Sequence, residues 1–215
     1  MIAVATPIHQ IKLAPDSAMM ISGLTWVRYK ALLNELGDDR STRTAYDHGT
    51  LEIRMPGEAH EIINRLLAKI ITMLALELGI EANDFGSATL NRKSIDRGIE
   101  PDSCFYIQNA MRGMAVKVSD SLSPDLAVEV DIASSSVGKM EIYQAIGIPE
   151  IWLYRRSILS IQCLRNGQYV DSLTSLSFPI TVELLNKWIE LRKTETDLTV
   201  LRSVQQFCRL RSEAS

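Results

Sequence analysis

The sequence is poor in the features that mark secreted proteins and small zinc-binding modules. Its 215 residues include only three cysteines, Cys104, Cys163 and Cys208, which lie far apart. Their odd number and wide spacing argue against a disulfide framework or a zinc knuckle, and favour a reducing cytoplasm. The first residues lack a basic segment followed by a long apolar core, so we expect no signal peptide.

Long uncharged apolar runs are missing as well. The most apolar helical stretch, 60–79, is interrupted by Glu61, Arg65, Lys69 and Glu77. It is therefore too charged to cross a membrane. The formal net charge is −3, which gives no general electrostatic attraction to nucleic acid. Binding of nucleic acid would have to depend on a local basic patch or on metal ions.

What is present is the composition of an ordinary globular protein, with 46% apolar and 23% charged residues. At this length a single domain of moderate size is the default. Residues 1–20 show no clear period and predict an extended or partly disordered arm. Residues 21–215 contain no repeat or linker, and they predict one domain that ends in helices over 181–211.

The hydrophobic periodicity predicts a mixed α/β domain. Apolar residues spaced three and four apart predict helices over 25–36 and 60–79, and alternation predicts a hairpin over 43–54. The remaining expected elements, in chain order, are strands 81–92 and 99–107, a loop 109–118, a strand 126–132, a helix 138–146, a strand 150–154 and a hairpin 157–172. We expect the long helix over 60–79 to pack on a mixed sheet.

Two apolar stretches that are predicted to be strands contain carboxylates, which are unfavourable in a buried strand. Asp102 follows Pro101 at the start of one predicted strand, and Glu129 and Asp131 lie in the near-continuous apolar run 124–132. Such a run is typical of a central strand covered on both faces. An acid inside it is costly unless it is paired or metal-bound. Glu129 and Asp131 share a face because side chains alternate along a strand, and Asp102 lies close to them if its strand is the neighbour.

Carboxylates this close repel one another unless a cation lies among them. Their oxygen atoms suit Mg²⁺ or Mn²⁺, which would lower the pKa of a bound water and neutralise charge on a phosphate. Lys139 begins the helix just beyond the strand, and its long side chain could reach back to orient that water or hold the phosphate charge. We therefore predict a phosphodiester-cleaving site in which Asp102, Glu129 and Asp131 bind the metal and Lys139 is catalytic.

Each of these residues also has a simpler interpretation. Asp102 could satisfy the amides of a turn, as aspartate often does. Asp131 could be a solvent-facing acid at a strand end, and Lys139 a solvated lysine. Glu61 could serve only as a favourable acid in the first turn of its helix. The serines at 134–136 are interpreted as helix caps rather than nucleophiles, because no histidine follows them.

An ordered set of motifs resembles one known family. The motifs are Tyr46-Asp47-x-Gly49-x-Leu51-Glu52-Ile53, Pro56 with His60-Glu61, Gly98-x-Glu100-Pro101-Asp102, Pro124-Asp125-Leu126-x-Val128-Glu129-Val130, Ser134–Ser136, Lys139, Tyr143 and Gly147-Ile148-Pro149-Glu150-Ile151-Trp152. Over residues 22–180 the chain resembles the bacterial "putative restriction endonuclease" family, formerly called a domain of unknown function. That family belongs to the PD-(D/E)XK nuclease superfamily.

The resemblance implies an α/β (α+β) restriction-endonuclease-like core, with a mixed four-stranded sheet flanked by helices in the order αβββαβ. It also implies Mg²⁺-dependent hydrolysis of phosphodiesters. Asp102 matches the aspartate of the "PD" motif, and Glu129 matches the acid of the "(D/E)XK" motif. The chain departs at the motif's lysine, where Asp131 stands, and the resemblance implies that Lys139 takes over from the following helix. Glu61 matches an acid from the first core helix.

Taken together, the sequence predicts a cytoplasmic, Mg²⁺- or Mn²⁺-dependent endonuclease acting on DNA, with RNA as an alternative substrate. Cutting both strands is often the work of a symmetric dimer, so we expect a homodimer. The rival prediction is a catalytically degenerate nuclease fold that acts as a nucleic-acid-binding or protein-interaction module. The acidic net charge and the missing lysine within the strand favour this rival.

Overall fold

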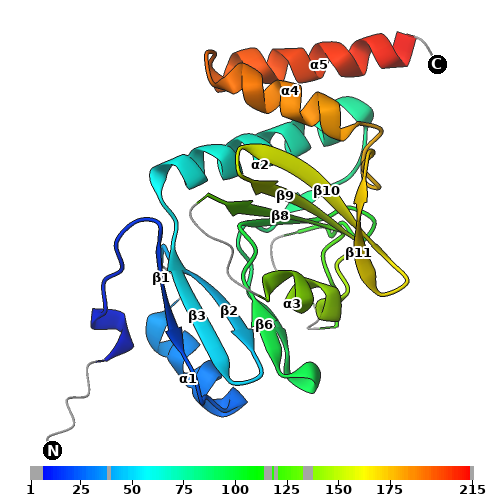
Figure 1. The fold of residues 1–215 in the computed structure, drawn as a ribbon. Helices are drawn as coiled ribbons and strands as arrows, with labels where there is room; N and C mark the ends of the chain where they lie inside the picture. The colour runs from blue at the N-terminus through cyan, green and yellow to red at the C-terminus, as the bar shows by residue number, and fades with distance from the viewer. Residues whose placement is uncertain (1–6, 38–39, 114–117, 119–120, 133–137, 214–215) are drawn as a thin grey trace, which may run out of the picture.

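The computed structural model describes residues 7–37, 40–113, 118, 121–132 and 138–213, which form two β-sheets and five α-helices (Figure 1). The smaller sheet is antiparallel, with strand order β1-β3-β2-β6-β5. Its strands are β1 (Ser17–Ile21), β2 (Arg43–Asp47), β3 (Thr50–Met55), β5 (Leu90–Arg92) and β6 (Arg97–Ile99). The larger sheet has the order β11-β10-β9-β8-β7-β4. Its strands are β4 (Asn83–Asp84), β7 (Ser103–Tyr106), β8 (Leu126–Asp131), β9 (Glu150–Arg155), β10 (Ile158–Arg165) and β11 (Gln168–Ser172).

The described residues contain five α-helices, and capping residues explain where two of them begin or end. They are α1 (Trp26–Leu36), α2 (Glu58–Leu78), α3 (Lys139–Ile146), α4 (Val182–Arg192) and α5 (Asp197–Glu213), with 3₁₀ turns at Ile8–Gln10 and Lys93–Ile95. The Thr25 side chain caps α1 by accepting a hydrogen bond from the Arg28 amide. Gly79 ends α2 in the left-handed conformation, as a glycine at that position does. Among the described residues, no helix is both long and apolar enough to cross a bilayer.

The larger sheet carries the predicted core order. Along the chain, α2 is followed by three strands of the larger sheet, β4, β7 and β8, and then by α3 and β9. Counting only the strands of this sheet, the order is αβββαβ. Strands β8 and β9 are parallel, and the other neighbouring pairs of this sheet are antiparallel. Helix α2 packs on one face of the sheet, and α4 and α5 lie beyond it (Figure 1). The predicted mixed α/β fold is thus confirmed.

Successive side chains of β8 point to opposite faces of the larger sheet, and each face packs against a different apolar cluster. Leu126, Val128 and Val130 pack into the apolar cluster formed with α2, α4 and α5. Ala127 points the other way, into the cluster that contains α3. Glu129 shares the face of Ala127, because side chains two apart lie on one side of a strand. The strand therefore presents its acid to α3 rather than to the main core.

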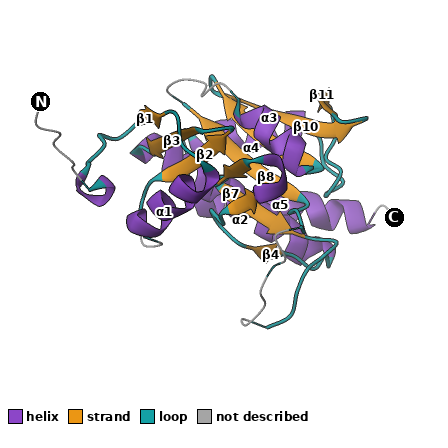
Figure 2. Cartoon of the chain, turned by 90° about the horizontal axis from the view of Figure 1, so that it is seen from below, coloured by secondary structure: helices purple, strands orange, loops and turns teal. Residues whose placement is uncertain are grey.

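The smaller sheet is closed on one side by α1, which lies near β2 and β3 when the molecule is viewed from below (Figure 2). Tyr29 of α1 stacks on Tyr46 of β2, with ring centroids 4.2 Å apart. On the other side, Ala45 and Ile99 pack into the cluster that contains α3. The two sheets therefore meet where α3 and the end of β8 lie.

The predicted bounds of two strands were wrong. The predicted strands 81–92 and 99–107 are each divided between the two sheets, giving β4 and β5, and then β6 and β7. The second break contains Pro101, which has no amide proton for a ladder, so the chain leaves one sheet and enters the other. The predicted arm contains β1, which pairs with β3 through five residues. The serines at 134–136 and part of the predicted loop at 109–118 lie outside the described residues.

Candidate active site

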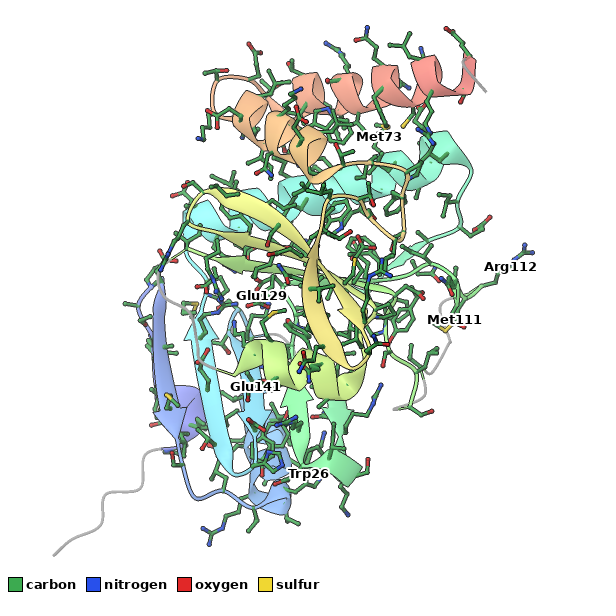
Figure 3. The ribbon with its side chains drawn as sticks, turned by 45° about the vertical axis from the view of Figure 1, so that its right-hand side comes forward. Trp26, Met73, Met111, Arg112, Glu129 and Glu141 are labelled. Atoms are coloured by element: carbon green, nitrogen blue, oxygen red, sulfur yellow. The ribbon has the colours of Figure 1, made fainter. Side chains whose placement is uncertain are left out.

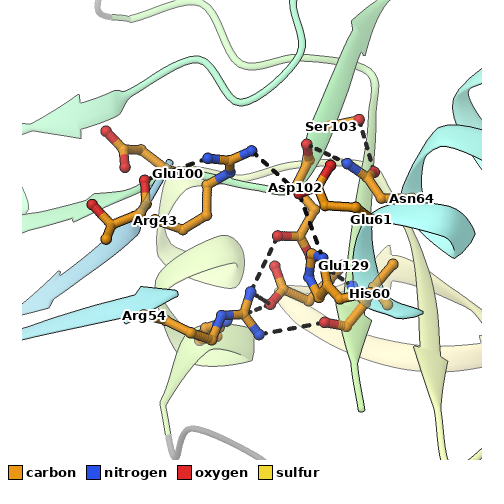
Figure 4. Close-up of polar contacts among 12 residues, drawn as sticks. Arg43, Arg54, His60, Glu61, Asn64, Glu100, Asp102, Ser103 and Glu129 are labelled. Carbon is orange, nitrogen blue, oxygen red and sulfur yellow. Dashed lines mark hydrogen bonds and ion pairs between the residues drawn. The ribbon is translucent and has the colours of Figure 1, made fainter. Parts of the chain in front are cut away.

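Asp102 is fixed between β8 and α2 (Figure 4). Strands β7 and β8 are neighbours, as predicted, and Asp102 directly precedes β7. Its Oδ2 accepts a 2.7 Å hydrogen bond from the amide of Val130. The side chain of Asn64 on α2 donates to the Asp102 carbonyl oxygen over 3.1 Å and accepts from Ser103 Oγ over 2.9 Å. The aspartate is buried, and its backbone and carboxylate are both held in place.

Glu129 is held by two residues of α3. Lys139 Nζ donates to Glu129 Oε1, and the Tyr143 hydroxyl donates to Oε2 over 2.6 Å. The two donors are four residues apart, which places them on one face of the helix. Figure 3 shows Glu129 in the interior, whereas Arg112 extends away from the body of the protein. The predicted approach of Lys139 to the strand acid is present in the structure.

Arg54 joins the two acids. It extends from β3 of the smaller sheet, and its Nη2 lies 3.1 Å from Asp102 Oδ1 and 3.2 Å from Glu129 Oε1. Its Nη1 donates to the Val130 carbonyl oxygen over 3.3 Å. The carboxylates from β8 and from the start of β7 therefore converge on one positively charged atom (Figure 4).

His60 completes the inner group. It lies in the first turn of α2, is 2% exposed, and places Nε2 3.0 Å from Asp102 Oδ2. Its other ring nitrogen, Nδ1, lies 3.8 Å from Glu61 Oε1, beyond hydrogen-bonding distance. His60 also lines a small pocket together with Arg54 and Asp131. A buried imidazole at this position has capacity for a further partner.

The charges in the group act strongly on one another. Burial alone would raise the pKa of Asp102, but the His60 ring and the Arg54 guanidinium hold it below the ordinary value. Burial works to lower the pKa of Arg54, and the carboxylates of Glu129 and Asp102 raise it above its ordinary value. Burial, followed by the charge of Glu129, raises the pKa of Tyr143 well above 10. At neutral pH Asp102 is therefore anionic, Arg54 cationic and Tyr143 a neutral donor.

The other two predicted site residues lie at the edge of this group. Asp131 is buried, and its Oδ2 lies 3.2 Å from Nε of Arg155. Glu61 is 37% exposed, and its oxygens lie 3.8 Å from Arg43, 3.6 Å from Arg65 and 3.8 Å from Nδ1 of His60. Neither acid has a described contact with the other carboxylates. Among the described residues, no group of three or more histidine, cysteine or acidic side chains is arranged to hold a metal ion.

The geometry brings together Asp102, Glu129 and Lys139, and adds three residues to which the sequence reasoning gave no role. Tyr143 could have been found, because it stands four residues after Lys139 in a predicted helix. His60 stands in one of the quoted motifs, which gave it no role, and Arg54 gave no signal at all. Their roles depend on how the smaller sheet and α2 dock against β8, which no local pattern reports.

An αβββαβ core with one buried acid just before a strand, a second on the neighbouring strand, and a lysine from the next helix defines a restriction-endonuclease-like α/β protein. The sequence model of the Uma2 family, described as "Putative restriction endonuclease", matches residues 26–194, and the chain belongs to that family. The resemblance to this family noted from the sequence is thereby confirmed.

Two further comparisons were made. No curated protein matches the chain. Among solved structures, it is similar to a "putative nuclease belonging to DUF820" from Anabaena variabilis ATCC 29413. The two share 17% sequence identity with a TM-score of 0.49, over 68% of this chain and 90% of that one.

Proposed function

We propose that this protein is a metal-dependent endonuclease that hydrolyses phosphodiester bonds in DNA. The observation that carries the proposal is the convergence of Asp102 Oδ1 and Glu129 Oε1 on a single cationic atom, Arg54 Nη2. A pair of buried acids aimed at one point is a binding site for positive charge. Family membership gives the chemistry that such a site would support.

The donor set suits Mg²⁺ or Mn²⁺. These ions take hard oxygen ligands, and Mg²⁺ in particular is commonly bound by one or two carboxylates, with water and substrate phosphate oxygens completing its shell. Asp102 and Glu129 would supply the two carboxylates. The buried His60, whose Nε2 lies 3.0 Å from Asp102 Oδ2, adds a further polar group at the same place. When bound, a divalent ion would activate water and neutralise charge that builds on the phosphate.

The residues of the chain would have separate roles. Lys139 would place its ammonium beside Glu129, where it can contact the attacking water or a phosphate oxygen. Tyr143 would fix the orientation of the Glu129 carboxylate through its 2.6 Å hydrogen bond. Asn64 would do the same for Asp102 by holding its backbone carbonyl. Asp131, paired with Arg155, would lie beside the metal without a described contact to the two ligands.

A plasmid assay tests the proposal. Purified protein is incubated with supercoiled plasmid in Mg²⁺, in Mn²⁺ and in EDTA, beside the variants Glu129→Ala and Glu141→Gln. Glu141 is an exposed acid on the same helix as Lys139, so it controls for loss of a nearby charge. We expect nicking by the wild type and by Glu141→Gln only with metal, and none by Glu129→Ala. Cleavage that persists in EDTA or in Glu129→Ala would contradict the assignment.

Two finer points belong to the same proposal. Parallel reactions with single-stranded and duplex RNA decide whether DNA is the preferred substrate. A symmetric homodimer would let two such sites act on both strands. Light scattering coupled to size-exclusion chromatography measures this directly, and a monomer mass at working concentration would reject the dimer.

A second candidate is a nuclease fold that binds nucleic acid or protein without cutting. It is favoured by the fact that all four carboxylate oxygens of Asp102 and Glu129 have partners within the protein. Calorimetric titration with Mn²⁺ separates the two candidates. Binding at millimolar metal that is lost in Glu129→Ala supports the enzyme, and no binding at that concentration supports the binding module.

A further inference from the structure

The guanidinium of Arg54 lies where a cation bound by both acids would be expected. Arg54 belongs to β3 of the smaller sheet, whereas Glu129 belongs to β8 of the larger sheet and Asp102 directly precedes β7 of that sheet. The same nitrogen, Nη2, is within 3.2 Å of an oxygen of each acid. The Arg54 side chain is 14% exposed, so this contact is largely removed from water.

Apart from His60, the charged side chains of the inner group already balance. Asp102 and Glu129 contribute two negative charges, and Arg54 and Lys139 contribute two positive charges. All four side chains are less than 15% exposed. Adding a divalent ion to this group would leave an excess of positive charge in a poorly hydrated place, which is strongly unfavourable. Metal entry must therefore be accompanied by the departure of a resident cation.

Of the two cations, Arg54 is the one whose place conflicts with the metal. Among the described residues, the acid that Lys139 pairs with is Glu129, from the side of α3, whereas Arg54 bridges both acids. The pocket beside Arg54, about 70 Å³ in volume, is lined by three further acids, Asp16, Glu52 and Asp131. A displaced guanidinium would find new carboxylate partners there, which lowers the cost of moving it.

We propose that Arg54 is the resident counter-cation of the Asp102–Glu129 pair, and that a divalent ion binds by displacing its guanidinium toward the neighbouring acidic pocket. The inference rests on the proposed function, because it concerns the same metal site. It makes Arg54 a positioning residue that holds the acids together before metal arrives and sets how tightly metal binds.

The exchange of the Arg54 guanidinium for a divalent ion is tested by measuring metal affinity in the absence of substrate. Mn²⁺ binding is followed by calorimetry for the wild type, for Arg54→Met, which keeps the alkyl stem, and for Arg43→Met. Arg43 is the matched control, since it stands directly opposite Arg54 in the β2–β3 ladder, is 13% exposed, and contacts Glu61 instead of the two acids. We expect Arg54→Met to bind Mn²⁺ at least about 10-fold more tightly than the wild type, the size of effect that one adjacent charge has on a carboxylate. Arg43→Met should match the wild type.

The possible results separate this inference from the proposed function. If the wild type binds Mn²⁺ and Arg54→Met binds it no more tightly, the exchange is rejected while the metal site stands. If neither binds Mn²⁺ at millimolar concentration, both fail.

Should Arg54→Met not fold, the wild type itself can be tested by following its arginine Nε–Hε signals by NMR during addition of diamagnetic Mg²⁺. The Arg54 signal should move and that of Arg43 should stay. An unmoved Arg54 signal at saturating Mg²⁺ would overturn the exchange.

Discussion

Tyr143 and Lys139 hold the two oxygens of a single carboxylate, that of Glu129, from one face of α3. The tyrosine does so as a neutral donor, because burial and the adjacent acid raise its pKa well above 10. It is therefore suited to orienting Glu129 and unsuited to acting as a base near neutral pH. The helix that follows the acid-bearing strand thus supplies both a cation and a fixed hydrogen bond.

Removing the hydroxyl of Tyr143 should weaken both the fold and the site. In Tyr143→Phe, Glu129 Oε2 loses its donor in a buried place, which we expect to cost about 1–3 kcal/mol of unfolding free energy. Metal affinity or cleavage rate should fall by about 10–100-fold, as is usual when the partner of a ligand is removed. Urea unfolding and the plasmid assay measure the two effects. Wild-type values for both would show that the hydrogen bond has no role in solution.

Replacing Lys139 should separate metal binding from cleavage. Lys139→Met removes a positive charge from beside Glu129, so Mn²⁺ should bind at least as tightly as to the wild type. Cleavage should nonetheless fall by about 10²–10⁴-fold if the ammonium acts on water or phosphate. Lys187→Met is the control, since Lys187 is an exposed lysine on α4. Near-normal nicking by Lys139→Met would remove Lys139 from the mechanism.

Glu150 is expected to be important for folding rather than for catalysis. It is fully buried, and its carboxylate accepts hydrogen bonds from the Trp152 indole, from the amides of Leu176 and Ser177, and from the Ser177 hydroxyl. Glu150→Ala would leave these donors without a partner, and we expect a loss of about 3–5 kcal/mol in urea unfolding. The exposed Glu190→Ala is the control. A loss below about 1 kcal/mol would mean that water replaces the carboxylate at little cost.

The pH dependence of stability should show the contribution of Asp197. Its hydrogen bond from Lys69, followed by that from Arg192, keeps its pKa below the ordinary value despite partial burial. A depressed pKa means that the unfolded chain takes up the proton first. The stabilisation is therefore complete above about pH 5 and is lost as pH falls below about 4 toward the folded-state pKa.

The comparison of wild type with Asp197→Asn isolates this effect. The difference in their unfolding free energies should be largest near neutral pH and should shrink through the acid range. Glu183→Gln is the control, because Glu183 is a highly exposed acid on α4. A difference between the wild type and Asp197→Asn that stays constant with pH would show that Asp197 stabilises the protein by some means other than its charge.

Much of the core and part of the site could be predicted because their signals are local. The apolar run around Val128 is long enough to predict a central strand, and the acid inside it needs an explanation that only pairing or metal can give. Lys139 follows it closely in the chain, so a short connection suffices to bring the two together. The structure bears out the predicted neighbouring of β7 and β8.

The parts that could not be predicted depend on contacts between distant segments. A pattern that alternates, such as the one around Arg54, shows that one face of a hairpin is polar, but it does not show what that face meets. Here it meets the other sheet, so an arginine that looks solvent-facing is 14% exposed. Glu61 illustrates the reverse, since its carboxylate lies among Arg43, Arg65 and His60 and has no described contact with Asp102 or Glu129.

The delivery of Arg54 by a hairpin outside the larger sheet has a consequence for protein engineering. Residues 43–55 could be exchanged for those of another family member while Asp102 and β8, which bears Glu129, are left intact and the buried Tyr46, Leu51 and Ile53 are kept. Such chimeras would vary the charge that faces Asp102 and Glu129 without altering the nuclease-like scaffold. The polar face of the β2–β3 hairpin can thus be varied separately from the face that packs against α1.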